Sequence, residues 1–296
     1  MPNEAKKSQT FQKFEPYMEK LEPYIEKARA YRDKVLAMHN DSLEKTIAIA
    51  LSICFVCAIL VSFAAVALKP IQQHNKALDM KKNILEVAGI LEPGMDIDSA
   101  FSEKIEAKIV DLASGDYVED IDVDAYDQRK AAKDPELSER IPPEKDIASI
   151  KVKARLAKVY LVKSPDGQIQ SLILPVHGYG LWSTMYGFLA LDADGQTVQS
   201  INFYDQAETP GLGGEVVNPS WRALWKGKKV YSESGEPALE LIKGVVEPGK
   251  PGAEYQVDGL AGATLTSRGV TNLVRYWMSE DGFAPYLAKI RQNGVG

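Results

Sequence analysis

One uncharged apolar run, Thr46 to Leu68, constrains this chain more than any other feature of its sequence. Lys45 and Lys69 bracket its 23 residues. A helix that rises 1.5 Å per residue makes such a run about 34 Å long, which is enough to cross the hydrocarbon core of a lipid bilayer with some tilt. The sequence therefore predicts a single transmembrane helix over residues 45–69.

A cleaved signal peptide is the alternative interpretation of this run. Ala65-Val66-Ala67 resembles a cleavage site, but the run is longer than the apolar part of a signal peptide, and 45 residues precede it. Charge alone leaves the direction of insertion open, because the basic residues on the two sides are balanced. Near the run, Arg29, Arg32, Lys34 and Lys45 on one side are matched by Lys69, Lys76, Lys81 and Lys82 on the other.

Composition excludes several classes of function. The 35 basic and 41 acidic residues give a formal net charge of -6, so no basic field is expected for nucleic acid, which is not a predicted partner. Cys54 and Cys57 both lie in the apolar run, where packing explains them. His39, His74 and His177 are far apart in the sequence, and their spacing to carboxylates predicts no metal site. No dinucleotide, phosphate-binding or serine-hydrolase motif occurs.

Residues 1–44 form a polar extension with a strongly helical pattern. Glu15 to Leu21 is echoed by Glu22 to Ala28, and each copy carries a proline, Pro16 and Pro23. Proline inside a helix costs about 3 kcal/mol, so the pattern predicts two helices, the second opened by Pro23, or one sharply kinked helix. An apolar stripe at helical spacing could dock on a partner or on the membrane surface, and its partner is unknown. The stripe consists of Phe14, Tyr17, Leu21, Tyr24, Ala28, Tyr31 and Val35.

After the membrane run, the pattern predicts a helical connector over residues 70–99, with its clearest helix at Asn75 to Val87. Ser102 to Leu112 is predicted to be a further helix. Asp116 to Pro143 is acidic and loop-like. The remainder, residues 100–296, is predicted to be one α+β domain.

Apolar residues alternate with period two from Ala157 onward, which predicts two β-hairpins. Turn residues separate the strands of each pair. Four strands joined in this way imply an antiparallel sheet, with helices flanking it in sequence. The predicted strands are Val159 to Val162, Ile169 to Val176, Met185 to Leu191 and Val198 to Tyr204, and the predicted later helices are Ser267 to Met278 and Phe283 to Ile290.

Two glycine-rich segments are the candidates for ligand binding, Glu208 to Glu215 and Asp258 to Ser267. Glycine lets a backbone approach a flat ligand closely and turn its N–H groups toward it. Plain turns are the alternative for the first segment. For the second, the alternative is a helix that starts near Arg268 and is capped by Thr266 or Ser267. The small residues of that segment leave the Thr264 hydroxyl open.

From Ser42 to the C-terminus, the sequence resembles the C subunit of the bacterial sodium-translocating NADH:quinone oxidoreductase. Gly262-Ala263-Thr264 alone would also match the wider FMN-binding family, which includes the G subunit of Rnf complexes. The resemblance rests on four stretches together, which are Tyr126 to Lys133, Leu174 to Ser183, Glu208 to Glu215 and Asp258 to Ser267.

The resemblance implies that FMN is attached covalently, as a phosphate ester on the threonine of an Asp-x-x-(Ser/Thr)-Gly-Ala-Thr motif. In this sequence that threonine is Thr264. A separate magnesium-dependent flavin transferase moves FMN from FAD to this hydroxyl in the family. Ala261 stands where the motif prefers serine or threonine, a change expected to be tolerated because Asp258, Gly262, Ala263 and Thr264 are all present.

The resemblance also implies which residues surround the flavin. No catalytic residue and no metal ligand is expected on this chain. Trp182 has an alternative interpretation, because tryptophan at a sheet edge is commonly part of the core. The expected cofactor-binding residues are Thr264, Asp258, Gly262, Ala263, Leu265 and Thr266 in one segment, Glu208, Thr209, Gly211, Leu212, Gly213 and Gly214 in another, and Leu181, Trp182 and Ser183 in a third.

The function implied is an electron relay in an NADH:ubiquinone reductase that pumps sodium. The protein would take electrons from an iron centre in the membrane and pass them to another flavin, in a complex of six subunits. The N-terminus would lie in the cytoplasm and the FMN domain on the periplasmic side of the inner membrane. Three alternatives remain: a relay like the G subunit of Rnf complexes, a stand-alone membrane-tethered flavin reductase, and a tethered binding domain without redox chemistry.

Overall fold

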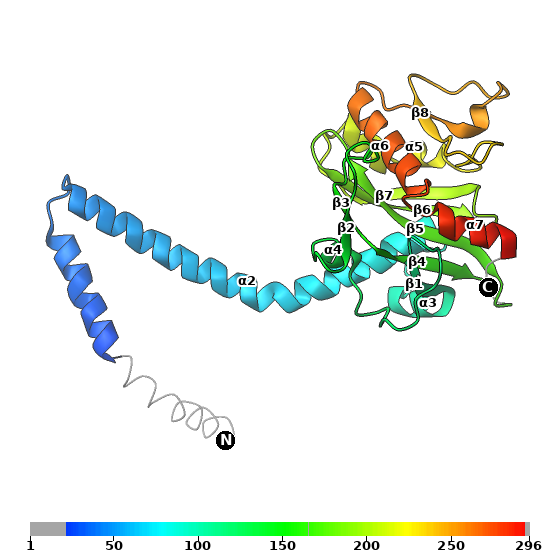
Figure 1. The fold of residues 1–296 in the computed structure, drawn as a ribbon. Coiled ribbons are helices and arrows are strands. Elements are labelled where there is room, and N and C mark those ends of the chain that lie inside the picture. The colour runs from blue at the N-terminus through cyan, green and yellow to red at the C-terminus, as the bar shows by residue number, and fades with distance from the viewer. Residues whose placement is uncertain (1–21, 165, 294–296) are drawn as a thin grey trace. The chain divides into compact units, whose positions relative to one another are not determined.

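The computed structural model describes residues 22–164 and 166–293 (Figure 1). Contacts divide the chain into two units, Met1–His74 and Asn75–Gly296. Residues 22–37 are helical. Because residues 1–21 lie outside the described residues, the predicted opening of this helix at Pro23 stays a prediction. The first copy of the seven-residue repeat, Glu15 to Leu21, lies outside the described residues.

Helix α2, Leu43–Val87, contains the whole apolar run. Its most apolar 18-residue window has a mean hydropathy of 2.8 and none of that window is buried. Within the described part of the chain, it is the one helix long and apolar enough to cross a membrane. Pro70 lies inside it without ending it, so the apolar run and the helix predicted at Asn75 to Val87 are one continuous element.

A five-stranded antiparallel sheet, in the order β1-β4-β5-β6-β7, forms the centre of the second unit. The two predicted hairpins are confirmed. One pairs β4 (Leu156–Lys163) with β5 (Ile169–Tyr179), and the other pairs β6 (Thr184–Asp192) with β7 (Val198–Asp205). β5 also pairs with β6 along its length, so the four strands are consecutive neighbours.

The helix predicted at Ser102 to Leu112 is wrong. Helix α3 (Ile97–Lys104) ends near the start of that segment, and the chain continues as strand β1 (Ile105–Asp111). β1 pairs with β4 over its whole length. The physical reason is tertiary, because the otherwise unpaired edge of β4 supplies backbone partners that an isolated short helix cannot offer.

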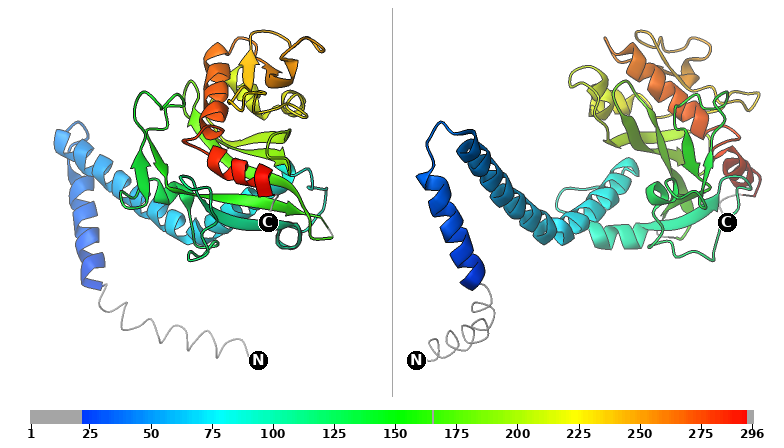
Figure 2. Two further views of the ribbon diagram at one scale, coloured as in Figure 1. Left: turned by 45° about the vertical axis from the view of Figure 1, so that its right-hand side comes forward. Right: turned by 60° about the vertical axis from the view of Figure 1, so that its left-hand side comes forward.

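Both faces of the sheet are buried, each by a different set of helices (Figures 1 and 2). Successive strand residues point to opposite faces. On β4, Val159 and Leu161 pack with helices α5 (Pro219–Ala223), α6 (Thr264–Trp277) and α7 (Ala284–Asn293). Tyr160 and Val162 pack instead with α3 and the C-terminal end of α2. Burial on both faces explains why the strands are apolar along almost their whole length.

Polar contacts attach the C-terminal end of α2 to strand β7 and helix α5. The Asn202 side-chain amide on β7 donates to the backbone oxygen of Asn83, at 3.2 Å. Arg222 in α5 forms an ion pair with Glu86, at 2.7 Å. These contacts bring the end of α2, β7 and α5 into one rigid arrangement.

Shorter elements complete the domain, and several fall in the segment predicted as an acidic loop. Helix α4 and the β2–β3 hairpin begin there, and β8 and β9 form a separate parallel pair. Their bounds are α4 Gln128–Ala131, β2 Ser138–Arg140, β3 Val152–Ala154, η1 Gly213–Val217, β8 Glu240–Ile242, η2 Ala253–Tyr255 and β9 Gln256–Asp258.

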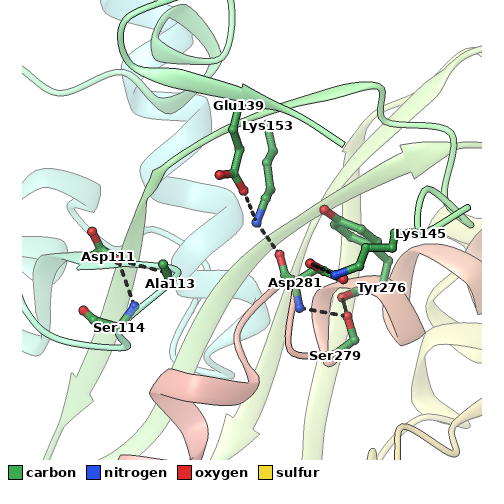
Figure 3. Close-up of polar contacts among 9 residues, drawn as sticks. All are labelled: Asp111, Ala113, Ser114, Glu139, Lys145, Lys153, Tyr276, Ser279 and Asp281. Carbon is green, nitrogen blue, oxygen red and sulfur yellow. Dashed lines mark hydrogen bonds and ion pairs between the residues drawn. The ribbon is translucent and has the colours of Figure 1, made fainter. Parts of the chain in front are cut away.

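A buried lysine ties the β2–β3 hairpin to the turn between α6 and α7 (Figure 3). Lys153 is 5% exposed, and its ammonium lies 2.9 Å from the Glu139 carboxylate and donates to the backbone oxygen of Asp281. Lys145 pairs with the Asp281 carboxylate at 3.0 Å. Because a buried charge is costly unless paired, this cluster fixes the C-terminal end of α6. The N-terminal end of α6 carries Thr264.

Candidate functional site

The second glycine-rich segment ends in helix α6, which begins at Thr264 and not near Arg268. The predicted cap by Thr266 or Ser267 is therefore wrong. Gly262 has a φ of +71°, a conformation that favours glycine, and it redirects the chain just before the helix. The residue at the N-cap position is Ala263, which makes no side-chain capping hydrogen bond.

Thr266 and Ser267 lie inside α6, where their hydroxyls have other partners. The Thr266 hydroxyl donates to the Glu208 carboxylate at 2.6 Å. The Ser267 hydroxyl accepts from the backbone N–H of Leu260 at 3.0 Å. Both side chains are buried, so they hold the segment together from within.

Thr264 is exposed, as the sequence predicted. It is the first residue of a 14-residue helix. The first backbone N–H groups of a helix have no acceptor within the helix, and the helix dipole adds positive potential at that end. An anionic phosphate on the Thr264 oxygen would therefore lie in a favourable place. The residues present fit a phosphate ester at this position.

Glu208 is the buried centre of the first glycine-rich segment, with 5% of the residue exposed. One carboxylate oxygen, Oε1, accepts the backbone N–H groups of Leu181 at 3.1 Å, Trp182 at 3.0 Å and Ser183 at 3.4 Å. The other oxygen, Oε2, accepts the Thr266 hydroxyl. The carboxylate thereby joins the turn between β5 and β6 to the first turn of α6.

Two glycines leave room for this carboxylate. Gly180 closes the β5–β6 turn through its N–H, which donates to the Ser183 oxygen at 2.8 Å. A Cβ at Gly180 would lie 2.5 Å from Oε1 of Glu208. A Cβ at Gly213 would lie 2.9 Å from Oε2 and would collide with the Thr266 hydroxyl. A side chain at either position would push the segments apart.

The environment of Glu208 keeps it ionised. Burial by itself raises the pKa of a carboxyl group. The hydrogen bonds from Thr266 and from the backbone of Trp182, Leu181 and Ser183 favour the charged form and outweigh burial, so the pKa of Glu208 is lowered from its ordinary value. At neutral pH this group is a buried anion.

Apolar side chains are exposed around these segments. Trp182 is 64% exposed, so it is not a core side chain, and its indole N–H donates to the Thr209 hydroxyl at 3.1 Å. Leu265 is 51% exposed and Leu212 is 43% exposed. A Cβ at Gly262 would lie 3.0 Å from a methyl group of Leu212, which shows how closely the two glycine-rich segments approach. The surface offers apolar contact to a flat aromatic group.

The other predicted residues have structural partners. The Asp258 carboxylate accepts the backbone N–H of Val246 at 2.8 Å, so it holds the loop after β8. The Gly214 N–H donates to the Thr209 oxygen at 2.9 Å and closes a turn. Gly211 has a φ of +76° and open space around it. Leu181 is exposed, and the Ser183 hydroxyl accepts the N–H of Ala207 at 2.9 Å.

The Tyr126 to Lys133 stretch, far away in sequence, supports the end of β7. Arg129 forms an ion pair with Asp205 at 2.8 Å, and its guanidinium lies 3.4 Å from the centre of the Tyr186 ring. Asp205 is the last residue of β7, three residues before Glu208. Arg129 and Gly180 were not among the predicted site residues, although both lie in stretches that carried the resemblance.

No group of three or more histidine, cysteine, aspartate or glutamate side chains in residues 22–164 and 166–293 is arranged to hold a metal ion. Within the same residues, the site described above brings together all three predicted segments: the β5–β6 turn, the loop after β7 and the start of α6. The contacts of Glu208 connect all three.

Residues 180–279 match the model of the FMN-binding domain family. The chain is 51% identical over 257 residues to the C subunit of the Na(+)-translocating NADH-quinone reductase of Pseudomonas aeruginosa, a match that covers 86% of this chain and 98% of that relative. It is 49% identical over 257 residues to the C subunit of the same reductase from Vibrio alginolyticus, with the same coverage.

Two solved structures are also similar. The crystal structure of Shewanella oneidensis NqrC has 33% identity and a TM-score of 0.67, over 73% of this chain and 97% of that one. The C subunit of the Na(+)-translocating NADH-quinone reductase from Parabacteroides distasonis has 30% identity and a TM-score of 0.57, over 74% of this chain and 96% of that one.

Proposed function

Because this chain belongs to the family formed by the C subunit of the Na+-translocating NADH-quinone reductase, we propose that it carries FMN covalently on Thr264 and relays electrons within that complex. The domain that holds Thr264 matches the FMN-binding family. The observation that carries the proposal is the exposed Thr264 hydroxyl at the uncapped N-terminus of α6.

The role of Thr264 in attachment is to supply the acceptor oxygen. Its Oγ forms the new bond to the FMN phosphorus, the bond between the two phosphates of FAD breaks, AMP leaves, and the hydroxyl proton is released. A separate flavin transferase catalyses this step. The N–H groups at the start of α6 favour the negative charge of the resulting ester.

The role of the surrounding residues is to hold and orient the cofactor. FMN supplies the redox chemistry when bound. Trp182, Leu212 and Leu265 offer exposed apolar surface for its ring. The ester makes the cofactor intramolecular, so dilution cannot empty the site. An electron relay of this kind needs no substrate pocket on this chain.

Helix α2 supports the membrane part of the proposal, because its apolar window is fully exposed in the chain by itself. We propose that α2 crosses the inner membrane once, with residues 1–44 in the cytoplasm and the FMN domain in the periplasm. The electron donor would be an iron centre in the membrane, and the acceptor another flavin. The five remaining subunits of the complex are the expected partners, and a partner for residues 1–44 is still to be identified.

Flavin fluorescence on a denaturing gel tests the attachment. The full chain is expressed together with the flavin transferase, as wild type, Thr264→Ala and Thr197→Ala. Thr197 directly precedes β7 and lies outside the three predicted segments, so it serves as the threonine control. The wild type and Thr197→Ala should fluoresce, and Thr264→Ala should be dark. A dark wild-type band would refute covalent flavin, and a fluorescent Thr264→Ala band would refute the attachment residue.

The relay and a stand-alone reductase differ in what the purified protein does. A relay should not oxidise NADH unaided, whereas a membrane-tethered flavin reductase should. Purification through this chain should recover five further membrane subunits if it belongs to the complex. NADH oxidation by this chain alone, with no other subunits recovered, would favour the reductase.

A further inference from the structure

Glu208 is a buried anion whose partners are all neutral. The donors to its carboxylate are three backbone N–H groups and one hydroxyl. In residues 22–164 and 166–293, no lysine, arginine or histidine forms an ion pair with it. Neutral donors stabilise the charge without cancelling it, so its field extends into the surrounding site.

The charge is bonded to the helical turn that carries Thr264. Oε2 of Glu208 is bonded to Thr266, which is two residues after Thr264 in the first turn of α6. Oε1 is bonded to the turn that presents Trp182. The two oxygens of one carboxylate therefore set the distance between the start of α6 and the β5–β6 turn.

We propose that Glu208 is a positioning residue that holds the β5–β6 turn and the start of α6 together at the flavin site, and that its negative charge lowers the reduction potential of the flavin. The second part rests on the proposed function, since it requires FMN on Thr264. Reduction adds negative charge to the cofactor, and a fixed anion that is itself buried, and so little screened by water, opposes that addition. The first part concerns this chain alone.

Glu208→Gln removes the negative charge of the side chain and keeps its shape. The amide oxygen can keep the three backbone N–H groups that bind Oε1, and the Thr266 hydroxyl can rotate to accept from the amide nitrogen. Glu215→Gln is the matched control, because Glu215 lies in the same segment and its carboxylate accepts only from the Asn218 side chain at 2.7 Å in the described contacts. Both variants remove one negative charge from the same loop.

The potential of the attached flavin is measured by redox titration of the full chain, coexpressed with the flavin transferase. Glu208→Gln should move the midpoint potential to a more positive value while the flavin stays attached. Glu215→Gln should leave the potential close to that of the wild type. An unchanged potential in Glu208→Gln, or equal shifts in both variants, would overturn the effect of the Glu208 charge.

Amide hydrogen exchange tests the positioning role without any flavin. In a Thr264→Ala background, Glu208→Ala should speed exchange of the Leu181 and Trp182 amides about tenfold, because their buried acceptor is lost. Glu215→Ala should not. Equal exchange rates in the two variants would overturn the positioning role. A dark wild-type gel band would overturn the proposed function and the effect on potential, and the exchange rates would still decide the positioning role.

Discussion

The two glycine-rich segments have similar compositions and opposite arrangements. In the segment after β7, the ionised side chain, Glu208, is buried, and Gly213 is needed because a Cβ there would collide with the Thr266 hydroxyl. In the segment before α6, Gly262 is needed for its positive φ, and Thr264 is exposed. Glycine content alone therefore does not distinguish a segment that buries an anion from one that presents an exposed threonine.

Two threonines in the first turn of α6 show the same contrast between a buried and an exposed side chain. Thr264 is exposed, whereas Thr266 is 1% exposed and donates to Glu208. A helix advances about 100° per residue, so residues two apart point in opposite directions. The same residue type therefore takes two roles, which substitutions can separate.

The largest effects are expected from Thr264→Val and Thr266→Val. Thr264→Val should abolish covalent flavin and change the free energy of unfolding by no more than about 0.5 kcal/mol, because the side chain is exposed. Thr266→Val should retain flavin and cost about 1–3 kcal/mol, because Glu208 loses a buried donor. Gel fluorescence and thermal unfolding in detergent measure the two effects. If both variants lost flavin and neither lost stability, the division of roles would be wrong.

Gly213→Ala tests the packing of the glycine-rich segment after β7. The new Cβ would meet Glu208 and the Thr266 hydroxyl, and overpacking of this kind costs about 1–3 kcal/mol. In the double variant with Thr266→Ala, part of the clash disappears. The combined loss of stability should then be smaller than the sum of the two single losses by about 0.5 kcal/mol or more. Strict additivity would show that the two positions do not touch.

Acid should weaken the contact made by the first segment. The pKa of Glu208 is lowered by its hydrogen bonds despite burial, so Glu208 stabilises the fold above its unfolded pKa. That stability is lost as the pH falls through the folded pKa. The melting temperature of the wild type should therefore fall more between pH 7 and acid pH than that of Glu208→Gln. Parallel curves for the two proteins would contradict an ionised Glu208.

The smallest effect is expected from Ala261→Ser. Ala261 is exposed, so stability should change by no more than about 0.5 kcal/mol. The substitution restores the residue type that the flavin attachment motif prefers. The initial rate of flavin attachment by the transferase, followed by gel fluorescence, should rise modestly. A fall in that rate would contradict the expectation that serine at position 261 favours flavin attachment.

Local patterns predicted the long apolar helix and the four central strands well. A long run without charges identifies a helix, and short apolar runs separated by turn residues identify strands, without knowledge of their neighbours. The prediction failed at Ser102 to Leu112, which carries apolar residues compatible with either period. Pairing with β4 made Ile105–Asp111, most of this segment, a strand. The start of α6 was also misplaced, because a threonine and a serine suited to capping are instead bonded inside the fold.

Residues close together in the chain were enough to predict the long apolar helix and the hairpins, and they carry the resemblance that singles out Thr264. Tertiary structure alone decided that Thr266 is buried and that Glu208 accepts its hydroxyl. Glu208 and Thr266 are 58 residues apart in the chain, yet 2.6 Å separates their bonded oxygens. No local pattern encodes that contact, because it exists only after the sheet has brought the β5–β6 turn, the loop after β7 and α6 to one place.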